Sequence, residues 1–422
     1  MKVSFSHVAL GLVSIAASAT AAAGQTPAAT TPPAQASSAV AGDDDAGRTD
    51  VMDLYRRWRK LPPKTPTERR GATWTLVPIM SSKPSTGFAL GAGADVEFKI
   101  GDPATTRFST LTTSFAFSTR KQVSVVENLR IYGPNQRWMV AGQNHYTGTS
   151  SGNVTLGTGS AETGAPEIRY YSLQFSDTFY YRLGPNLFAG AGLHYARQTH
   201  IEPFPSDSPD WETSPFREYS SINGFDPSSQ TAAGPGVSVL FDNRDNQNDA
   251  VRGWLARASY RTYFAGFLGG DSTWQEVQLE LRTYHPLTAD KRHKLAFWGL
   301  GNFVTSGTAP YLSLPANGGD ELGRSARGYA EGRFRGEQLV YGEAEYRGLI
   351  TRNGFIGVVA FVNVTTIGGQ TAGEDLFDTA AIGRGFGIRI LVHKHSRSNL
   401  CVDVGWGRDG SRGFYLGYRD AF

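Results

Sequence analysis

The residues of this chain best placed for chemistry carry charge and alternate along one stretch. Beyond residue 338, Glu343, Glu345 and Arg347 share one side of an alternating pattern, and the other side is apolar or aromatic (Val340, Ala344, Tyr346). Two carboxylates and a guanidinium in a row require water or ion pairs, whereas the opposite side favours apolar surroundings. The chemistry that this pattern offers is therefore charge pairing on one face of a strand.

The glycine-rich stretch before this strand supplies another cation. It reads GGDELGRSARGYAEGRFRGE from residue 318, with Arg327, Gly328 and Tyr329 at its centre. This much glycine and charge excludes a lipid-facing strand. Two interpretations remain open: a loop that folds back and pairs with the charged row, or a solvent-exposed surface loop, which is the commoner structure for such a stretch.

Few other side chains suggest chemistry. His393 and His395 would share a face at a strand end, but a zinc site needs further ligands, which favours solvated residues at a rim. Cys401 is the only cysteine, so it cannot form an internal disulfide, and we predict a packed, unreactive thiol. We identify no nucleophile elbow, phosphate-binding loop or dinucleotide fingerprint. The prediction is no catalytic residue, no metal site, no cofactor and no enzymatic activity.

Composition indicates the elements that must position these residues. Fifty glycines and 12% aromatic residues among 422 fit a β-barrel better than a helical membrane protein. Beyond the N-terminus no run of about twenty apolar residues predicts a membrane-spanning helix. The net charge of +3 is too small to indicate a nucleic-acid partner.

Alternation of apolar with polar or glycine residues predicts an all-β protein. From residue 73 to the C-terminus we expect a transmembrane antiparallel β-barrel of about 16 strands, with a long loop, about 306–337, folded into the lumen. A soluble β-sandwich would alternate too, but its polar face is usually rich in lysine. Here arginine, glutamate, glutamine, glycine and aromatic residues occupy that face.

The proline-rich loop at 200–233 does not fit this count easily. Counting strands places it on the periplasmic side, where turns are normally short. We therefore expect a missed strand or hairpin in it, and a genuine periplasmic insertion is the alternative.

The N-terminus has the pattern of an exported protein. Residues 1–23 predict a secretory signal peptide. Residues 24–72 predict a linker, in which 50–70 could form a short amphipathic helix near the periplasmic mouth or be disordered. Residues 73–422 are then the barrel, with no room before it for a folded repeat of several dozen residues.

The central loop resembles that of a known family. Ala326-Arg327-Gly328-Tyr329, followed by GRF at 332–334, is similar to the inward-folded loop of the BamA/TamA superfamily of outer-membrane proteins, the bacterial surface antigen barrel. In that family the arginine reaches acidic residues on nearby strands and pins the loop inside. The resemblance implies that Arg327 is a latch and that Glu345 is its expected partner.

The expected latch partners depart from the family at one position. Family members often place an aspartate two residues after a lumen-facing aromatic residue, and here Phe361 is followed by Asn363. An amide can still accept a hydrogen bond, but without charge assistance. Glu343, Glu345 and Asp403 are the remaining carboxylates that could serve Arg327.

Two further stretches are similar to the same family. FDNRDN at 241–246 with VRGW at 251–254 resembles its charged hairpin, in which Asp and Asn favour the turn. The last ten residues resemble an outer-membrane β-signal. Its residues of one parity are expected to face lipid: Phe414, Leu416, Tyr418 and Phe422.

The resemblance implies an integral protein of the bacterial outer membrane that assists insertion or translocation of proteins, or lipids, through a seam between first and last strands. Pro78 in the predicted first strand lacks the N–H of a ladder and normally marks an edge. The expected partners are outer-membrane lipid and lipopolysaccharide, the barrel-assembly machinery during insertion, and client proteins. The alternative is a passive channel or structural barrel without assembly activity.

Overall fold

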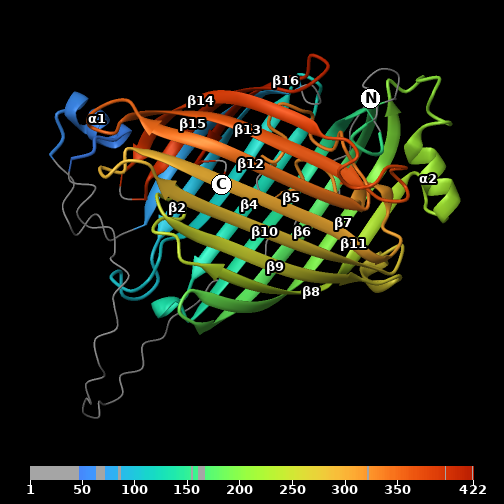
Figure 1. Ribbon diagram of the computed structural model, residues 1–422, viewed down its shortest axis with the longest axis horizontal. Helices are drawn as coiled ribbons and strands as arrows, with labels where there is room; N and C mark the ends of the chain where they lie inside the picture. Colours follow the sequence, from blue (N-terminus) through green and yellow to red (C-terminus); the bar gives the residue numbers. More distant parts are fainter. Residues whose placement is uncertain are drawn as a thin grey trace, which may run out of the picture. The chain divides into compact units, whose positions relative to one another are not determined.

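Sixteen strands of the described residues form one antiparallel sheet that closes into a barrel, with each strand beside its neighbour in sequence and β16 returning to β1 (Figure 1). The computed structural model describes residues 47–62, 72–83, 87–153, 155–159, 167–320, 323–394, 396–420 and 422. The predicted signal peptide, the linker up to residue 46 and its segment 63–71 lie outside these residues. The predicted fold class and strand number are confirmed.

The strands follow the expected ranges closely. Their bounds are β1 Thr73–Lys83, β2 Gly87–Phe98, β3 Ser109–Ser118, β4 Val123–Tyr132, β5 Trp138–Asn153, β6 Glu167–Gly184, β7 Leu187–Phe204, β8 Ser229–Asp242, β9 Gly253–Tyr263, β10 Trp274–Pro286, β11 His293–Gly307, β12 Gln338–Leu349, β13 Ile356–Gly368, β14 Ala381–His393, β15 Ser398–Trp406 and β16 Arg412–Tyr418.

The two faces of the wall differ in chemistry. Leu279 on β10 and Phe386 and Ile388 on β14 point outward and are exposed, whereas their sequence neighbours Glu280 and Arg389 are buried inside. Successive side chains of a strand point to opposite faces, so the alternation in sequence becomes an apolar outer surface and a polar interior.

The connection between β7 and β8 corrects the expectation for residues 200–233. It contains a helix, α2 (Pro215–Asn223), and no additional strand; β8 simply begins earlier than expected. In an antiparallel barrel the connection after an odd-numbered strand lies at the end opposite the start of β1, so the predicted periplasmic side was wrong. Figure 1 shows α2 at the far end of the barrel from α1 (Val51–Trp58).

Helix α2 packs over the loop between β11 and β12 at this far end. Phe216 and Tyr219 of α2 are buried against Tyr311, and the Tyr219 hydroxyl donates to the Ala309 carbonyl at 2.7 Å. The contact buries apolar side chains that a bare loop would expose to water.

Helix α1 precedes the first strand. Asp50 caps its first turn by accepting from the Asp53 N–H at 2.7 Å, and the Asp53 side chain reaches back to the Asp50 N–H. Burial opposes the charged form of Asp53, but the hydrogen bond and charge of Lys394 outweigh it and lower the pKa of that carboxyl. No helix of the described residues is long and apolar enough to cross a membrane.

The seam between β1 and β16 is the weakest pairing in the described wall. β1 pairs with β2 from Thr73 to Lys83, but its described pairing with β16 consists of Ser81 opposite Tyr415 and Ser82 opposite Phe414. Pro78 lies beyond this short ladder and has no N–H with which to extend it.

Because the two faces of the wall differ, an arginine introduced at two adjacent positions should destabilise the barrel to very different extents. Leu279→Arg places a charge on the lipid side and should lower the free energy of unfolding by about 2–4 kcal/mol in a bilayer. Gln278→Arg, which points into a polar cavity of the lumen, should change it far less. Urea titration of both variants in lipid vesicles measures the difference, and equal losses would contradict the assignment of the faces.

Candidate functional site: buried charges inside the barrel

The guanidinium of Arg327 lies at the centre of the charges inside the barrel. Its Nη2 is 2.5 Å from Glu345 Oε2 and also contacts Glu343 Oε1, and its Nη1 is 3.0 Å from Asp403 Oδ2. All four side chains are buried, and the guanidinium carbon lies 3.7 Å from the centre of the Phe361 ring. Nη1 and Nη2 together donate to three carboxylates, and an aromatic ring lies against the guanidinium, so this buried cation is stabilised by charge-assisted hydrogen bonds and a cation–π contact.

The partners of Arg327 come from separate strands whose parity turns them inward. Glu343 and Glu345 lie on β12 and Asp403 lies on β15, while the connection from β11 to β12 carries Arg327 to them. The structure therefore places the described residues of this connection, 308–320 and 323–337, inside the barrel, as expected for about 306–337. It brings Arg327 to all three candidate carboxylates, not to Glu345 alone.

Glycines in the wall make room for this loop. A Cβ added to Gly405 would lie 2.9 Å from the Gly328 nitrogen, and one added to Gly383 would lie 2.6 Å from the Arg327 carbonyl oxygen. Gly328 itself has a φ of +104°, which side-chain-bearing residues rarely adopt. The loop can approach the wall this closely because these positions lack side chains.

Further hydrogen bonds hold the loop at Arg327 and at the two residues after it. The Gly328 N–H donates to the Tyr415 hydroxyl at 3.0 Å, and the Tyr329 hydroxyl donates to the Ile382 carbonyl at 2.7 Å. Asn363 donates its Nδ2 to the Arg327 carbonyl at 3.0 Å. Asn363 therefore contacts the main chain of the latch residue, while Glu343, Glu345 and Asp403 contact its guanidinium.

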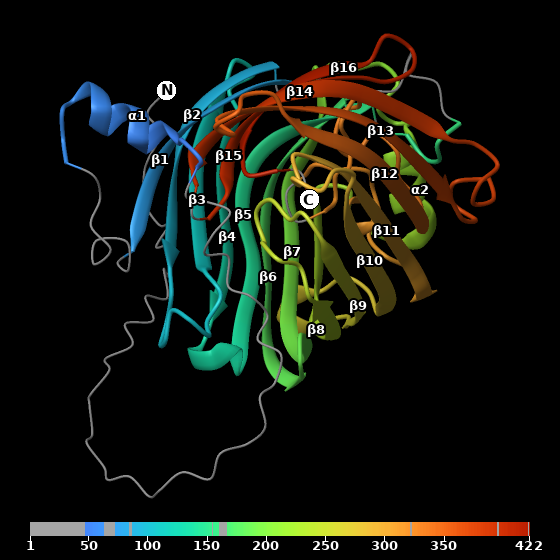
Figure 2. The same ribbon diagram turned by 60° about the vertical axis from the view of Figure 1, so that its left-hand side comes forward.

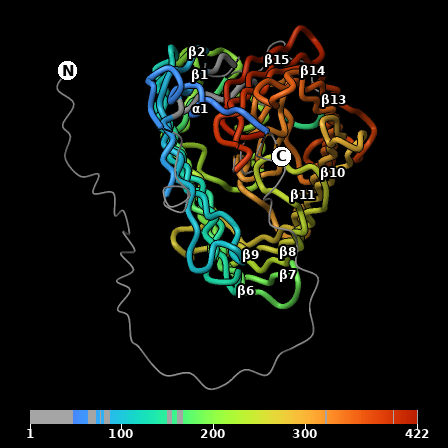
Figure 3. Tube along the Cα trace, turned by 90° about the vertical axis from the view of Figure 1, so that its left-hand side faces the viewer, coloured from blue at the N-terminus to red at the C-terminus, as the bar shows by residue number. Residues whose placement is uncertain are grey.

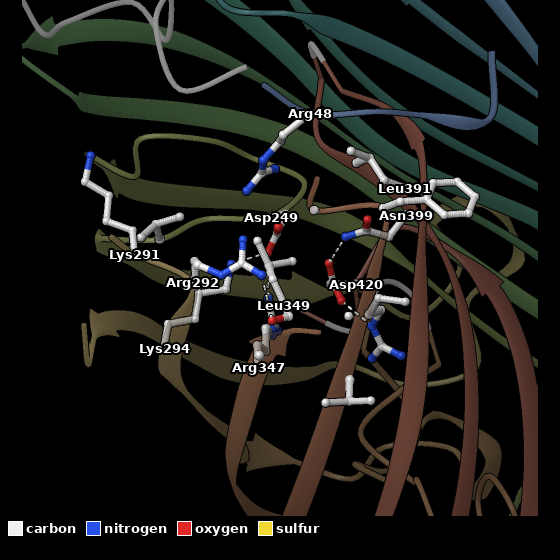
Figure 4. Close-up of a pocket in the computed structure, with 17 residues that line it drawn as sticks. Arg48, Asp249, Lys291, Arg292, Lys294, Arg347, Leu349, Leu391, Asn399 and Asp420 are labelled. Carbon is white, nitrogen blue, oxygen red and sulfur yellow. Dashed lines mark hydrogen bonds and ion pairs between the residues drawn. The ribbon is translucent and has the colours of Figure 1, made fainter. Parts of the chain in front are cut away.

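The charge network continues toward the end of the barrel where β1 begins. Arg389 lies 2.5 Å from both Asp403 Oδ1 and Asp420 Oδ1, and Arg347 Nε lies 2.6 Å from Glu345 Oε1. Figure 4 shows Asp420 held by Asn399 as well, near Arg347 and Asp249. These charges form one chain of ion pairs with Arg327 at its inner end.

The C-terminal residue belongs to this network and does not face lipid. Phe422 is buried, its ring lies 5.2 Å from that of Trp298, and its main-chain oxygen accepts from Arg347 Nη2 at 2.9 Å. Strand β16 ends at Tyr418, and Arg419, with a φ of +69°, turns the chain inward. The parity of a strand therefore does not extend to Phe422, and that expectation was wrong.

The rest of the expected β-signal remains in the wall. Phe414 and Leu416 lie opposite Val404 and Val402 of β15, on the outward parity. Tyr418 lies opposite Leu400, but its hydroxyl is buried near Ser398 and Glu97, so the expectation that it faces lipid was wrong. Tyr415 was not among the expected site residues. Its place between Phe414 and Leu416 gives it inward parity, from which a contact with the loop could have been predicted.

The charged hairpin between β8 and β9 ties distant strands at the end where β1 begins. Asp242 and Arg244 form a buried ion pair at 2.9 Å. In the turn, Asp245 forms an ion pair at 3.0 Å with Arg397 of the β14–β15 connection, and Asp249 forms one with Lys294 of β11. The resemblance located this hairpin, but the sequence did not indicate that it would bridge the mouth of the barrel.

The other candidate residues show no reactive arrangement. Cys401 is buried with its Sγ 3.0 Å from the Arg419 carbonyl, and His393 contacts the Thr75 hydroxyl at 2.5 Å; His395 lies outside the described residues. Residues 148–152 read GTSSG and do match the G-x-S-x-G pattern, but they lie within β5 rather than at a strand-to-helix turn. The described residues contain no group of three or more potential metal ligands.

Comparison with known proteins agrees with this architecture. The Omp85 superfamily domain matches residues 97–418. Among solved structures, BamA from Haemophilus ducreyi lacking POTRA domains 1–3 has a TM-score of 0.53 at 13% identity, with 83% of this chain and 70% of that chain covered. No curated protein matches.

Two CdiB structures are similar to a comparable degree. CdiB from Acinetobacter baumannii gives a TM-score of 0.50 at 13% identity over 82% of this chain and 59% of that chain. CdiB from Escherichia coli gives 0.52 at 10% identity over 85% and 63%. The chain thus spans less than two thirds of either CdiB, and at these identities the likeness concerns the fold alone.

Removal of the central cation should destabilise the barrel strongly. Arg327→Ala leaves three buried carboxylates without their shared partner, and we expect a loss of about 3–5 kcal/mol in the free energy of unfolding. Arg217→Ala, which removes an ion pair with exposed Glu212 on the outside, should cost about 0–1 kcal/mol. Equilibrium unfolding in detergent compares the two, and similar losses would show that the interior charges contribute little.

Proposed function

The chain belongs to the Omp85 superfamily of outer-membrane barrels, and from this premise we propose that it assists the insertion or translocation of proteins, or of lipids, at the outer membrane. The route that we propose is the seam between β1 and β16. The observation that carries the proposal is the short ladder there, Ser81 and Ser82 opposite Tyr415 and Phe414. Every other pair of neighbouring strands in the described barrel is joined over a longer register.

Side chains, rather than a ladder, close the rest of the seam. Arg419, at the end of β16, reaches past β1 to Asp95 of β2 at 2.6 Å and approaches Glu97 at 3.6 Å. Thr75 of β1 contacts His393 of β14. Such contacts break one at a time, whereas a continuous ladder resists opening along its whole length, so this wall favours lateral movement at β1.

We propose that Arg327, with Gly328, Tyr329, Glu343, Glu345, Asn363 and Asp403, acts as a latch that keeps the loop inside the lumen. The loop occupies the interior beside β12 to β15, where it would obstruct passage along the barrel axis. Transit toward the membrane through the seam remains compatible with a loop that stays in place. Client proteins and lipids are the proposed partners, and no step requires an enzymatic group.

A passive channel is the second candidate. A cavity of about 270 Å³ lies in the lumen beside β4 to β11, lined by polar side chains that include Arg130, Gln278 and Asn302. This part of the interior has room for water and small ions. The channel proposal requires that the loop leave a continuous path past it.

A disulfide across the seam should abolish the proposed activity. Ser82 and Phe414 lie opposite each other, at a separation of about 4.5–5.5 Å between Cα atoms that a disulfide can span. We expect the Ser82→Cys/Phe414→Cys variant, in a Cys401→Ser background, to give the outer-membrane proteome of a deletion strain, and reductant to restore the normal one.

The matched control shares one of the two cysteines. Val404→Cys with Phe414→Cys joins β15 to β16 within the wall and should leave the proteome normal. Full activity of the seam-locked protein would contradict lateral opening, and loss in both variants would point to damage to β16.

Conductance in planar bilayers separates the two candidate functions. We expect the wild-type barrel to conduct little and Arg327→Ala to open a larger pore, because the loop loses the charges that hold it. A large, steady conductance that Arg327→Ala leaves unchanged would favour the channel.

A further inference from the structure

Helix α1 presents an apolar side that no described part of the chain covers. Val51, Leu54, Tyr55 and Trp58 recur at the spacing that brings them to one side of a helix. Each is at least 36% exposed, and Trp58 is 75% exposed. No residue of the helix is buried. A soluble surface rarely leaves an entire helical stripe of this kind in water.

The opposite side of α1 is fixed to the rim of the barrel. Lys394, in the connection after β14, lies 2.6 Å from Asp53 Oδ2, and its main-chain N–H donates to Asp50 Oδ2 at 3.0 Å. The Thr49 N–H donates to the Asn353 carbonyl at 3.1 Å. These contacts set the rotation of the helix, with its polar side against the rim and its apolar side away from it.

The helix lies beside the apolar outer surface of the barrel. Phe386 and Ile388 of β14 face outward and are exposed, and the same strand ends at His393, one residue before the Lys394 tether. Figure 2 shows α1 outside the wall, beside β1, and Figure 3 shows it in front of β1 and β2, at the end where β1 begins. The uncovered stripe therefore lies at the end of a strand whose outward face meets hydrocarbon in an outer-membrane barrel.

Positive charge accompanies the apolar stripe. Arg57, Arg59 and Lys60 fall in the last turn of α1 and directly after it, and Arg59 lies over the Trp58 ring at 5.9 Å from its centre. Arg56 points to the other side of the helix, where its Nε donates to the Pro62 carbonyl at 2.8 Å. Tryptophan beside basic residues suits the boundary between acyl chains and anionic headgroups. A protein partner would not require this charge.

We propose that α1 is an interfacial anchor that lies in the periplasmic leaflet of the outer membrane. Its apolar side chains enter the headgroup–acyl boundary, and its basic residues pair with lipid phosphates, anionic phospholipid being preferred. The anchor holds the chain next to β1 against the bilayer. The proposal requires only that the barrel spans the membrane, and it does not depend on activity at the seam.

Two positions on opposite sides of α1 test this proposal in the full-length protein. Leu54→Cys and Arg56→Cys, each in a Cys401→Ser background, are labelled with bimane and reconstituted into phosphatidylethanolamine–phosphatidylglycerol vesicles. We expect lipids brominated near the headgroup to quench the label at 54 several-fold more than the label at 56. Aqueous iodide should show the reverse order.

The outcomes that overturn the proposal are distinct. Equal iodide quenching at both positions would mean that α1 lies in water. Protection of position 54 from iodide without quenching by brominated lipid would mean that a protein covers the stripe, either a second copy or another partner.

Charge reversal tests the headgroup preference. Arg57→Glu with Arg59→Glu should reduce the bromolipid quenching at 54 in vesicles that contain phosphatidylglycerol, and much less in phosphatidylcholine vesicles. A reduction of the same size in both lipids would overturn the pairing with anionic headgroups.

Discussion

A guanidinium excluded from water and shared by three carboxylates is the interaction on which the interior of this barrel depends. Arg327 lies between Glu343 and Glu345, two carboxylates of one strand that would otherwise repel each other, and Asp403 from three strands away. Removing either sign from such a cluster leaves an uncompensated buried charge, which is strongly unfavourable. The position of the loop and the order of the wall strands therefore stabilise each other.

The same interaction makes the barrel asymmetric. Beside β12 to β15 the interior is filled by the loop, while beside β4 to β11 a polar cavity remains. The loop also reaches the last strand, because the Gly328 N–H binds the Tyr415 hydroxyl. Strand β16, on one side of the seam, is thus attached to the latch. Strand β1, on the other side, is held by β2 and by side-chain contacts such as that of Thr75 with His393. In the proposed lateral opening, β1 would move away from a β16 that the latch holds.

Strand alternation predicted which side chains point into the barrel, but the sequence did not predict their partners or the path of the chain beyond the end of a strand. Glu343 and Glu345 alternate with apolar residues, so their inward placement followed from the strand period alone. Asn363 was placed inward correctly, but its partner depends on how three carboxylates divide the space around one guanidinium, which no local pattern encodes. Phe422 shares the parity of β16 but not its path, because Arg419 takes up a left-handed conformation.

The inward path of the tail takes the last residues of the chain away from the seam. Asp420 binds Arg389, and Phe422 packs against Trp298. The last residues therefore lie in the lumen and cannot continue β16 beside the N-terminal half of β1. A tail that stayed in the wall could pair with more of β1 but would leave Arg389 with one carboxylate fewer. The buried charges that hold the tail therefore remove Arg419, Asp420 and Phe422 from any pairing with β1. The ladder already ends before Leu416, within β16, on the side of β1 where Pro78 lacks an N–H, so the inward tail and the proline both limit the seam.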